Sequence, residues 1–136
     1  MTAQNLRSAH GGESMAYQRY TVWGQKAKEE GYPNVALLFE AISYAEQVHA
    51  GNHFEALDNC MGDFQVTSAA GFGIGSTAEN LEAAKEGEDY EIDQMYPTYS
   101  LVAKEQKENE AVRSFHYALE AEKIHSTLYG EAREAV

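Results

Sequence analysis

The chain has a single cysteine, Cys60, among its 136 residues. One cysteine cannot form an intrachain disulfide, and it excludes a metal knuckle built on a Cys-x-x-Cys pair. Basic residues are also scarce, because 10 Lys and Arg stand against 22 Asp and Glu, for a net charge of −12. This charge makes nucleic acid and anionic membranes poor partners, and it suits cations or a basic protein instead.

Long hydrophobic runs are absent as well. No segment approaches the roughly 18 apolar residues of a membrane span, and the start, MTAQNLRSAHGGES, has no apolar stretch of the signal-peptide type. The hydrophobic fraction of 43% nevertheless argues against disorder, and the length suits one domain over residues 1–136. The sequence therefore predicts a soluble, cytoplasmic, single-domain protein that binds neither membrane nor nucleic acid.

The chain contains one half-domain twice. The stretch TAQNLRSAHGGES at 2–14 matches TAENLEAAKEGED at 77–89 at an offset of 75 residues. Farther along, AEQVHA at 45–50 matches AEKIHS at 121–126 at an offset of 76. The second copy therefore holds one extra residue.

The extra residue lies between Glu88 and Tyr96, provided that Tyr20 and Tyr96 correspond. A single insertion in a long helix is usually absorbed as a π-bulge, often at a functional site. We therefore expect a π-helical distortion between these two positions.

Each half is predicted to form a pair of helices. Thr2 and Thr77 suit N-cap positions, since a threonine hydroxyl can accept a bond from a free helix amide. Gly31 and Pro33 end the first helix, and Pro97 predicts a kink in the third. The expected helices span about 3–30, 34–59, 77–105 and 109–134.

A glycine-rich segment at 60–76 separates the half-repeats, which span about 2–59 and 77–134. Four long helices with one long crossover predict an all-α, ferritin-like four-helix bundle built from two repeated helix pairs. A coiled-coil hairpin dimer is the alternative, but no heptad pattern is sustained through the four helices. No strand precedes the GFGIG stretch of the crossover, so no nucleotide-binding site is expected.

The two matching Glu-x-x-His pairs are predicted to point into the core. Residues three apart share a helix face. Glu46 and His49 fall on the same stripe as the apolar Phe39, and Glu122 and His125 fall on the equivalent apolar stripe of the last helix. Their polar side chains are therefore expected among buried apolar ones.

Three further glutamates join them in the predicted core. Glu13 shares a stripe with Tyr20 on the first helix, and Glu88 and Glu91 share one on the third. Each uncompensated buried charge costs several kcal/mol, so five buried carboxylates call for cations. Two divalent ions meet the need, and the mixture of oxygen and imidazole ligands suits iron or manganese, with zinc as a further substitute.

The repeat assigns roles within this site. Glu46 and Glu122 occupy equivalent places and are predicted to bridge both metals, while His49 and His125 each cap one. Glu91 has no counterpart in the first half and breaks the symmetry. The predicted ligand set, with Glu13 and Glu88 as terminal ligands, is Glu13, Glu46, His49, Glu88, Glu91, Glu122 and His125.

Three more residues are expected beside the ligands. Tyr20 and Tyr96 are predicted to hold glutamate ligands in place through hydrogen bonds. His53 lies one turn beyond His49 on the same stripe, and we expect it beside the site or at its entrance rather than on a metal.

Four stretches, GGESMAYQRY, AEQVHA, GEDYEIDQMYP and AEKIHS, together resemble the diiron domain of the rubrerythrin family over essentially the whole chain. The resemblance implies two iron ions held by the same seven ligands, and reduction of hydrogen peroxide. In that family one iron exchanges a glutamate for a histidine between the oxidised and reduced states. The matching pair here is Glu91 and His49.

The four cysteines that hold the iron of a rubredoxin domain are absent from this chain. It is therefore similar to the rubredoxin-lacking members, called erythrins or sulerythrin-like proteins, and a separate donor such as rubredoxin is expected to supply electrons. The expected function is a non-haem diiron peroxidase in oxidative-stress defence.

Two other functions stay open, a ferroxidase or iron-handling ferritin-like protein and a metal-stapled binding module without turnover. A homodimer is also expected, either unswapped or swapped through the crossover.

Overall fold

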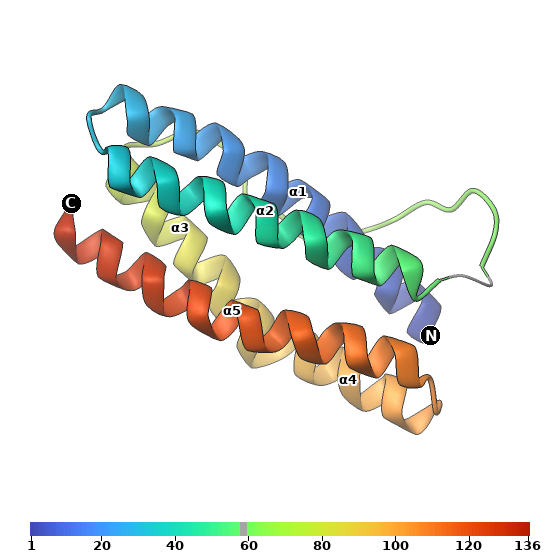
Figure 1. Cartoon of the computed structure of the whole chain (residues 1–136). Helices are drawn as coiled ribbons and strands as arrows, with labels where there is room; N and C mark the ends of the chain where they lie inside the picture. The colour runs from blue at the N-terminus through green and yellow to red at the C-terminus, as the bar shows by residue number, and fades with distance from the viewer. Residues whose placement is uncertain (58–59) are drawn as a thin grey trace.

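The computed structural model describes residues 1–57 and 60–136, and every regular element in them is helical. The elements follow in the order α1 (Thr2–Glu29), α2 (Pro33–Glu55), α3 (Thr77–Tyr90), the π-helix η1 (Glu91–Met95), α4 (Tyr96–Glu105) and α5 (Asn109–Ala135). Because α3, η1 and α4 continue without a break, they form one of the four rods of the bundle (Figure 1). The predicted ferritin-like four-helix bundle is therefore confirmed.

The π-helix lies within the interval where the second half-repeat carries its extra residue. The widened turn accommodates that residue without interrupting the rod, so the prediction of a π-helical distortion is confirmed. Pro97 follows directly in the first turn of α4, where its missing amide hydrogen is tolerated.

The predicted N-caps are wrong. Met1 precedes α1, and Ser76 caps α3 in a capping box with Glu79. Thr77 instead donates from its amide and its hydroxyl to Oε1 of Glu30, at 2.8 and 2.7 Å.

Thr2 makes the same pair of contacts with Oε1 of Gln106. The two threonines therefore join the ends of different helices, and this tertiary role takes the place of capping.

The second helix is shorter than predicted, because α2 ends at Glu55 instead of continuing to 59. The amide of Leu57 bonds to the carbonyl of Phe54 in a tighter turn, which begins the departure into the crossover. Residues 58 and 59, the last of the predicted helix, lie outside the described residues.

The crossover lies along α1 and runs in the same direction (Figure 1). The Ser8 hydroxyl donates to the Thr67 carbonyl at 2.9 Å, and the Trp23 indole donates to the Gly73 carbonyl at 2.9 Å. A Cβ atom added at Gly11 would stand only 3.1 Å from Val66, so this glycine permits the close approach. The crossover therefore carries the chain to the start of α3.

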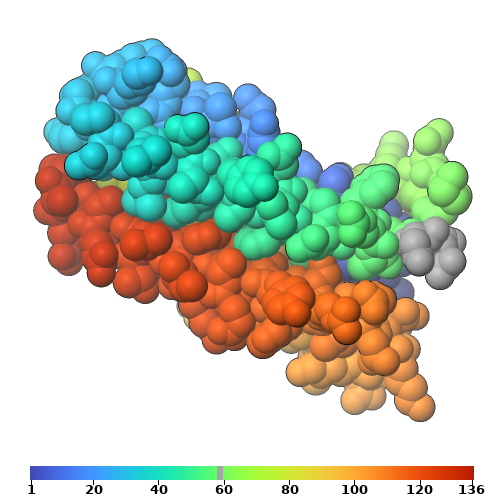
Figure 2. All heavy atoms as spheres, in the orientation of Figure 1, coloured from blue at the N-terminus to red at the C-terminus, as the bar shows by residue number. Residues whose placement is uncertain are grey.

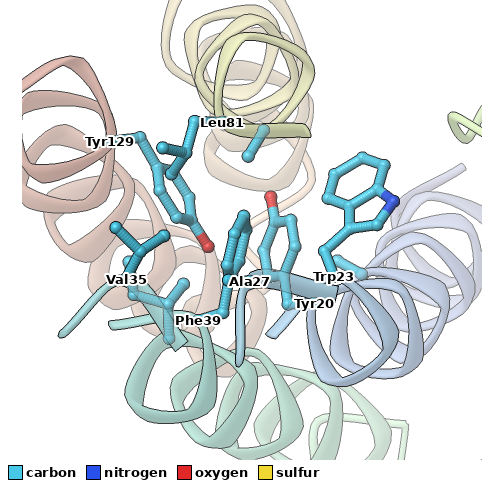
Figure 3. Close-up of a cluster of buried hydrophobic side chains, with 10 residues drawn as sticks. Tyr20, Trp23, Ala27, Val35, Phe39, Leu81 and Tyr129 are labelled. Atoms are coloured by element: carbon cyan, nitrogen blue, oxygen red, sulfur yellow. The ribbon is translucent and has the colours of Figure 1, made fainter. Parts of the chain in front are cut away.

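Two clusters of buried side chains fill the two ends of the bundle. The Tyr20 cluster includes Trp23, Phe39, Leu81 and Tyr129, and Figure 3 shows the side chains of this cluster converging from several helices. The Tyr96 cluster lies toward the other end and includes Leu6, Ala9, Ala103, Ala111 and Phe115. The layer between them holds the polar residues of the next section.

No helix within residues 1–57 and 60–136 is long and apolar enough to cross a membrane.

Candidate metal centre

Six of the seven predicted ligands lie together in two groups between the clusters of apolar side chains. The first ligand cluster is Glu13, Glu46, His49 and Glu122, and the second is Glu46, Glu88, Glu122 and His125. Within each group, one ligand atom per residue lies within 4.8 Å of all the others. Both clusters contain Glu46 from α2 and Glu122 from α5, so these two glutamates lie between two adjacent cation positions.

The histidines face the carboxylates with the same nitrogen. Nδ1 of His49 lies 2.9 Å from Oε1 of Glu122 and 3.3 Å from an oxygen of Glu13 and of Glu46. Nδ1 of His125 lies 3.0 Å from Oε1 of Glu46. A nitrogen among several carboxylate oxygens is the donor set expected for iron, manganese or zinc.

Without a bound cation, the site would hold protons in its place. Burial, and then the neighbouring Glu46, raise the pKa of Glu13 from 4.5 to about 8. Burial alone would lower the pKa of His125, but Glu122 and Glu46 raise it from 6.5 to about 9. The carboxylates around His49 likewise raise its pKa well above 6.5 against the effect of burial. A bound cation would displace these protons.

The residues present fit a pair of cations. Oε2 of Glu88 is buried and has no hydrogen-bond partner among the described residues, and the buried oxygens of Glu122 lie 2.9 and 3.4 Å from Nδ1 of His49 and His125 without the geometry of a hydrogen bond. A buried polar atom without a partner costs about 1–3 kcal/mol. Coordination to a metal would satisfy all three oxygens.

Glu91 is a member of neither ligand cluster. It is the first residue of η1 and is partly exposed as a whole residue. Its carboxylate is nevertheless enclosed by protein, and burial, followed by the charges of Glu13 and Glu46, raises its pKa well above 4.5. The structure therefore places Glu91 at the edge of the first ligand cluster, within electrostatic reach of it.

Each tyrosine predicted beside the site binds a glutamate from the opposite half-repeat. The Tyr20 hydroxyl donates to Oε1 of Glu88 at 2.9 Å, and the Tyr96 hydroxyl donates to Oε1 of Glu13 at 2.7 Å. All four side chains are at most 2% exposed, so these bonds are shielded from water. The two halves of the chain thus hold each other's terminal glutamates in place.

His53 supports one of these tyrosines and does not join a ligand cluster. Its Nε2 lies 2.8 Å from the Tyr96 hydroxyl, and its Nδ1 lies 2.6 Å from the Ser114 hydroxyl. Burial lowers the pKa of His53 to about 3, so the ring is neutral, with one nitrogen donating and the other accepting. His53 therefore extends the chain of hydrogen bonds from Glu13 away from the site.

Two residues near the site were not singled out by the sequence analysis. Ser114 gave no signal in the sequence, because its role depends on the packing of α5 against α2. Tyr129 could have been found, since it lies 76 residues beyond His53 and is its counterpart in the repeat. Its ring packs 5.4 Å from that of Tyr20, and its buried hydroxyl has no hydrogen-bond partner among the described residues.

Known proteins match the chain over nearly its whole length. The rubrerythrin family profile matches residues 4–132. Rubrerythrin-2 of Clostridium acetobutylicum is 51% identical over 135 residues, which cover 99% of this chain and 73% of that protein. Nigerythrin of Nitratidesulfovibrio vulgaris is 34% identical over 128 residues, which cover 94% of this chain and 63% of that protein.

A solved structure of nigerythrin in its fully reduced, all-ferrous state superposes with a TM-score of 0.90 at 33% identity, covering 98% of this chain and 66% of that chain. The family match contains every predicted ligand, and the fold and the paired Glu/His clusters agree with it. The chain therefore belongs to the rubrerythrin family, and its helical bundle is the diiron domain of that family.

Proposed function

We propose that this chain reduces hydrogen peroxide to water as a non-haem diiron peroxidase in oxidative-stress defence. The observation that carries the proposal is the sharing of Glu46 and Glu122 by two ligand clusters. Shared carboxylates hold two cations close enough to act on one small molecule, and peroxide reduction needs two electrons at one place.

When bound, the two ferrous ions supply one electron each and act as Lewis acids toward the peroxide. The chain contributes the surroundings. Buried carboxylates lower the net charge of the centre, which favours the more highly charged oxidised state. Tyr20 and Tyr96 hold Glu88 and Glu13 in fixed orientations through their hydroxyl groups.

Glu91 and His49 are the proposed pair for redox-linked ligand exchange. His49 lies inside the first ligand cluster, whereas the Glu91 carboxylate lies at its edge on the π-helix. This arrangement would support an exchange in which the histidine and the glutamate alternate at one metal position. Among residues 1–57 and 60–136 the π-helix occurs in the second half-repeat alone, and it would supply the asymmetry that lets one metal position differ from the other.

We expect electrons to come from a separate rubredoxin-like protein and the chain to form a homodimer. Both ligand clusters are complete within one chain, so a swap of helices is not needed to build the site. Helices α2 and α5 lie side by side (Figure 2), and their exposed apolar side chains include Leu37, Tyr44 and Ile124 at 64%, 67% and 62% exposure. A second copy would remove this apolar surface from water.

The test is anaerobic loading with two Fe(II) per chain, followed by stopped-flow mixing with hydrogen peroxide or, separately, with O2. We expect hydrogen peroxide to oxidise the bound iron faster than O2 does, and we expect sustained turnover when reduced rubredoxin is added. Faster oxidation by O2, with uptake of iron far beyond two per chain, would replace it with an iron-handling function. A loaded protein that reacts with neither oxidant would be a metal-stapled module.

A further inference from the structure

A cavity of about 450 Å³ lies beside the metal centre, between α1, the α3–η1 rod and the crossover. Glu91 and Tyr20 line its inner side, and Tyr20 in turn holds Glu88. The cavity is partly open to solvent, and residues 67–71 of the crossover form one of its walls. It therefore leads from the surface to the edge of the first ligand cluster, where Glu91 lies.

The cavity is large for hydrogen peroxide. One water molecule takes up roughly 30 Å³ in the liquid, and hydrogen peroxide has only one oxygen more. The volume of about 450 Å³ leaves room for a substituent of several carbon atoms on a peroxide whose O–O group reaches Glu91.

Besides Glu91, the walls carry one charged side chain of each sign, Arg19 and Glu86, together with several apolar groups, which suits an uncharged molecule with a small apolar part. Ala69 and Ala70 of the crossover, Ala83 of α3 and Met95 of η1 present methyl groups and a thioether along the cavity. Several buried carboxylates lie just beyond Glu91, so an anion should enter less readily than a neutral molecule of the same size. Hydroperoxides of short alkyl chains are neutral near pH 7 and fit both conditions.

We propose that this cavity is the peroxide entrance and that it admits short-chain alkyl hydroperoxides in addition to hydrogen peroxide. The proposal rests on the peroxidase function and specifies its substrate class. The O–O bond of the hydroperoxide breaks, the two electrons come from the two ferrous ions as both become ferric, and two protons come from solvent. The products are one alcohol and one water.

Gly87 offers a way to narrow the entrance. It lines the cavity from α3, and a Cβ atom added there meets nothing within 4 Å, so a larger side chain would extend into open space. Gly51 on α2 is the matched control, because it is also helical, its Cβ position is equally open, and it lies away from the cavity.

The experiment compares Gly87→Leu and Gly51→Leu with the unaltered chain, each with two irons bound. Stopped-flow oxidation by tert-butyl hydroperoxide should slow at least about tenfold in Gly87→Leu, while oxidation by hydrogen peroxide slows less than about threefold. Azide binding to the ferric protein, followed by its charge-transfer absorption, should also slow in this variant. Gly51→Leu should match the unaltered chain in all three.

An unaltered chain that reacts with hydrogen peroxide but not with tert-butyl hydroperoxide would overturn this inference and leave the peroxidase function standing. Reaction with neither peroxide would overturn both. Equal slowing of the two peroxides in Gly87→Leu, or no slowing at all, would also overturn it. Azide binding tests the route by itself: slower binding in Gly87→Leu than in Gly51→Leu supports the cavity as the entrance, and equal rates contradict it.

Discussion

The two ends of the bundle are copies of one arrangement, and they differ in the residue that lies behind the tyrosine. At one end, Tyr96 binds Glu13 and has His53 behind it. At the other end, Tyr20 binds Glu88, and Tyr129 occupies the place that corresponds to His53.

His53 completes a chain of hydrogen bonds to Ser114, whereas the Tyr129 hydroxyl is buried without a partner among the described residues. The tyrosine–glutamate hydrogen bond is therefore the same in both half-repeats, whereas the residue that packs behind the tyrosine differs. The first ligand cluster is the one next to His53 and to Glu91, so both departures from symmetry fall on the same side of the site.

Removal of a shared glutamate should have the largest effect. Glu122→Ala should reduce bound iron from two per chain to nearly none, because Glu122 belongs to both ligand clusters and its loss leaves the other carboxylates to repel one another. Metal analysis after gel filtration measures this. The control is Glu120→Ala, which changes a half-exposed carboxylate on the same helix and should keep both irons. Two irons in Glu122→Ala would show that it is not a shared ligand.

The π-helix supplies the next test of the asymmetry. Glu91→Ala should retain two irons, because Glu91 lies outside both ligand clusters, yet its reaction with peroxide should slow by about tenfold or more through loss of the exchanging ligand. Asp93→Ala changes an exposed carboxylate on the same π-helix and should leave the rate unaltered. An undiminished rate in Glu91→Ala would remove it from the mechanism.

The metal-free chain should become less stable as the pH rises from 6.5 to 9. The pKa values of Glu13 and His125 are higher in the folded chain than in the unfolded chain, so the folded chain binds more protons in this range. The free energy of unfolding therefore falls as the pH rises and these protons are released. The loss should be about 2–4 kcal/mol in urea denaturation. With iron present, the stability should instead rise with pH, because the metal competes with protons for the same ligand atoms. A metal-free stability that rises over this range would contradict the description of the site.

We expect the smallest effect from changes to His53 and Tyr129, the residues that lie behind the two tyrosines. His53→Leu should destabilise the metal-free chain by about 1–3 kcal/mol, because it leaves the buried Ser114 hydroxyl without its partner. Tyr129→Phe removes an unpaired hydroxyl and should change the stability by less than about 0.5 kcal/mol. Urea denaturation at constant pH measures both. Equal losses of stability in the two variants would contradict the difference in hydrogen bonding between His53 and Tyr129.

Much of this arrangement could be predicted from the sequence because it follows from periodicity. The offset of the repeat identified the equivalent Glu-x-x-His pairs, and helix phase placed Glu46 and Glu122 inward. The change of offset also predicted the π-helix before Tyr96. Each of these inferences needs only the geometry of a single helix.

What the sequence did not predict depends on contacts between helices. Thr77 satisfies the rule for an N-cap, but Glu30 of another helix recruits its hydroxyl. The position of Glu91 at the edge of the first ligand cluster depends on how the π-helix turns its side chains, which helix phase alone does not give. The pairing of His53 with Ser114 likewise requires the packing of α2 against α5.

The most direct test of the account is anomalous diffraction at the iron edge from crystals of the iron-loaded protein. We predict two iron positions, each coordinated by one oxygen of Glu46 and one of Glu122, with Glu13 and Glu88 on opposite sides. A single iron, or a pair of irons in which either lacks a bond to both shared glutamates, would contradict it.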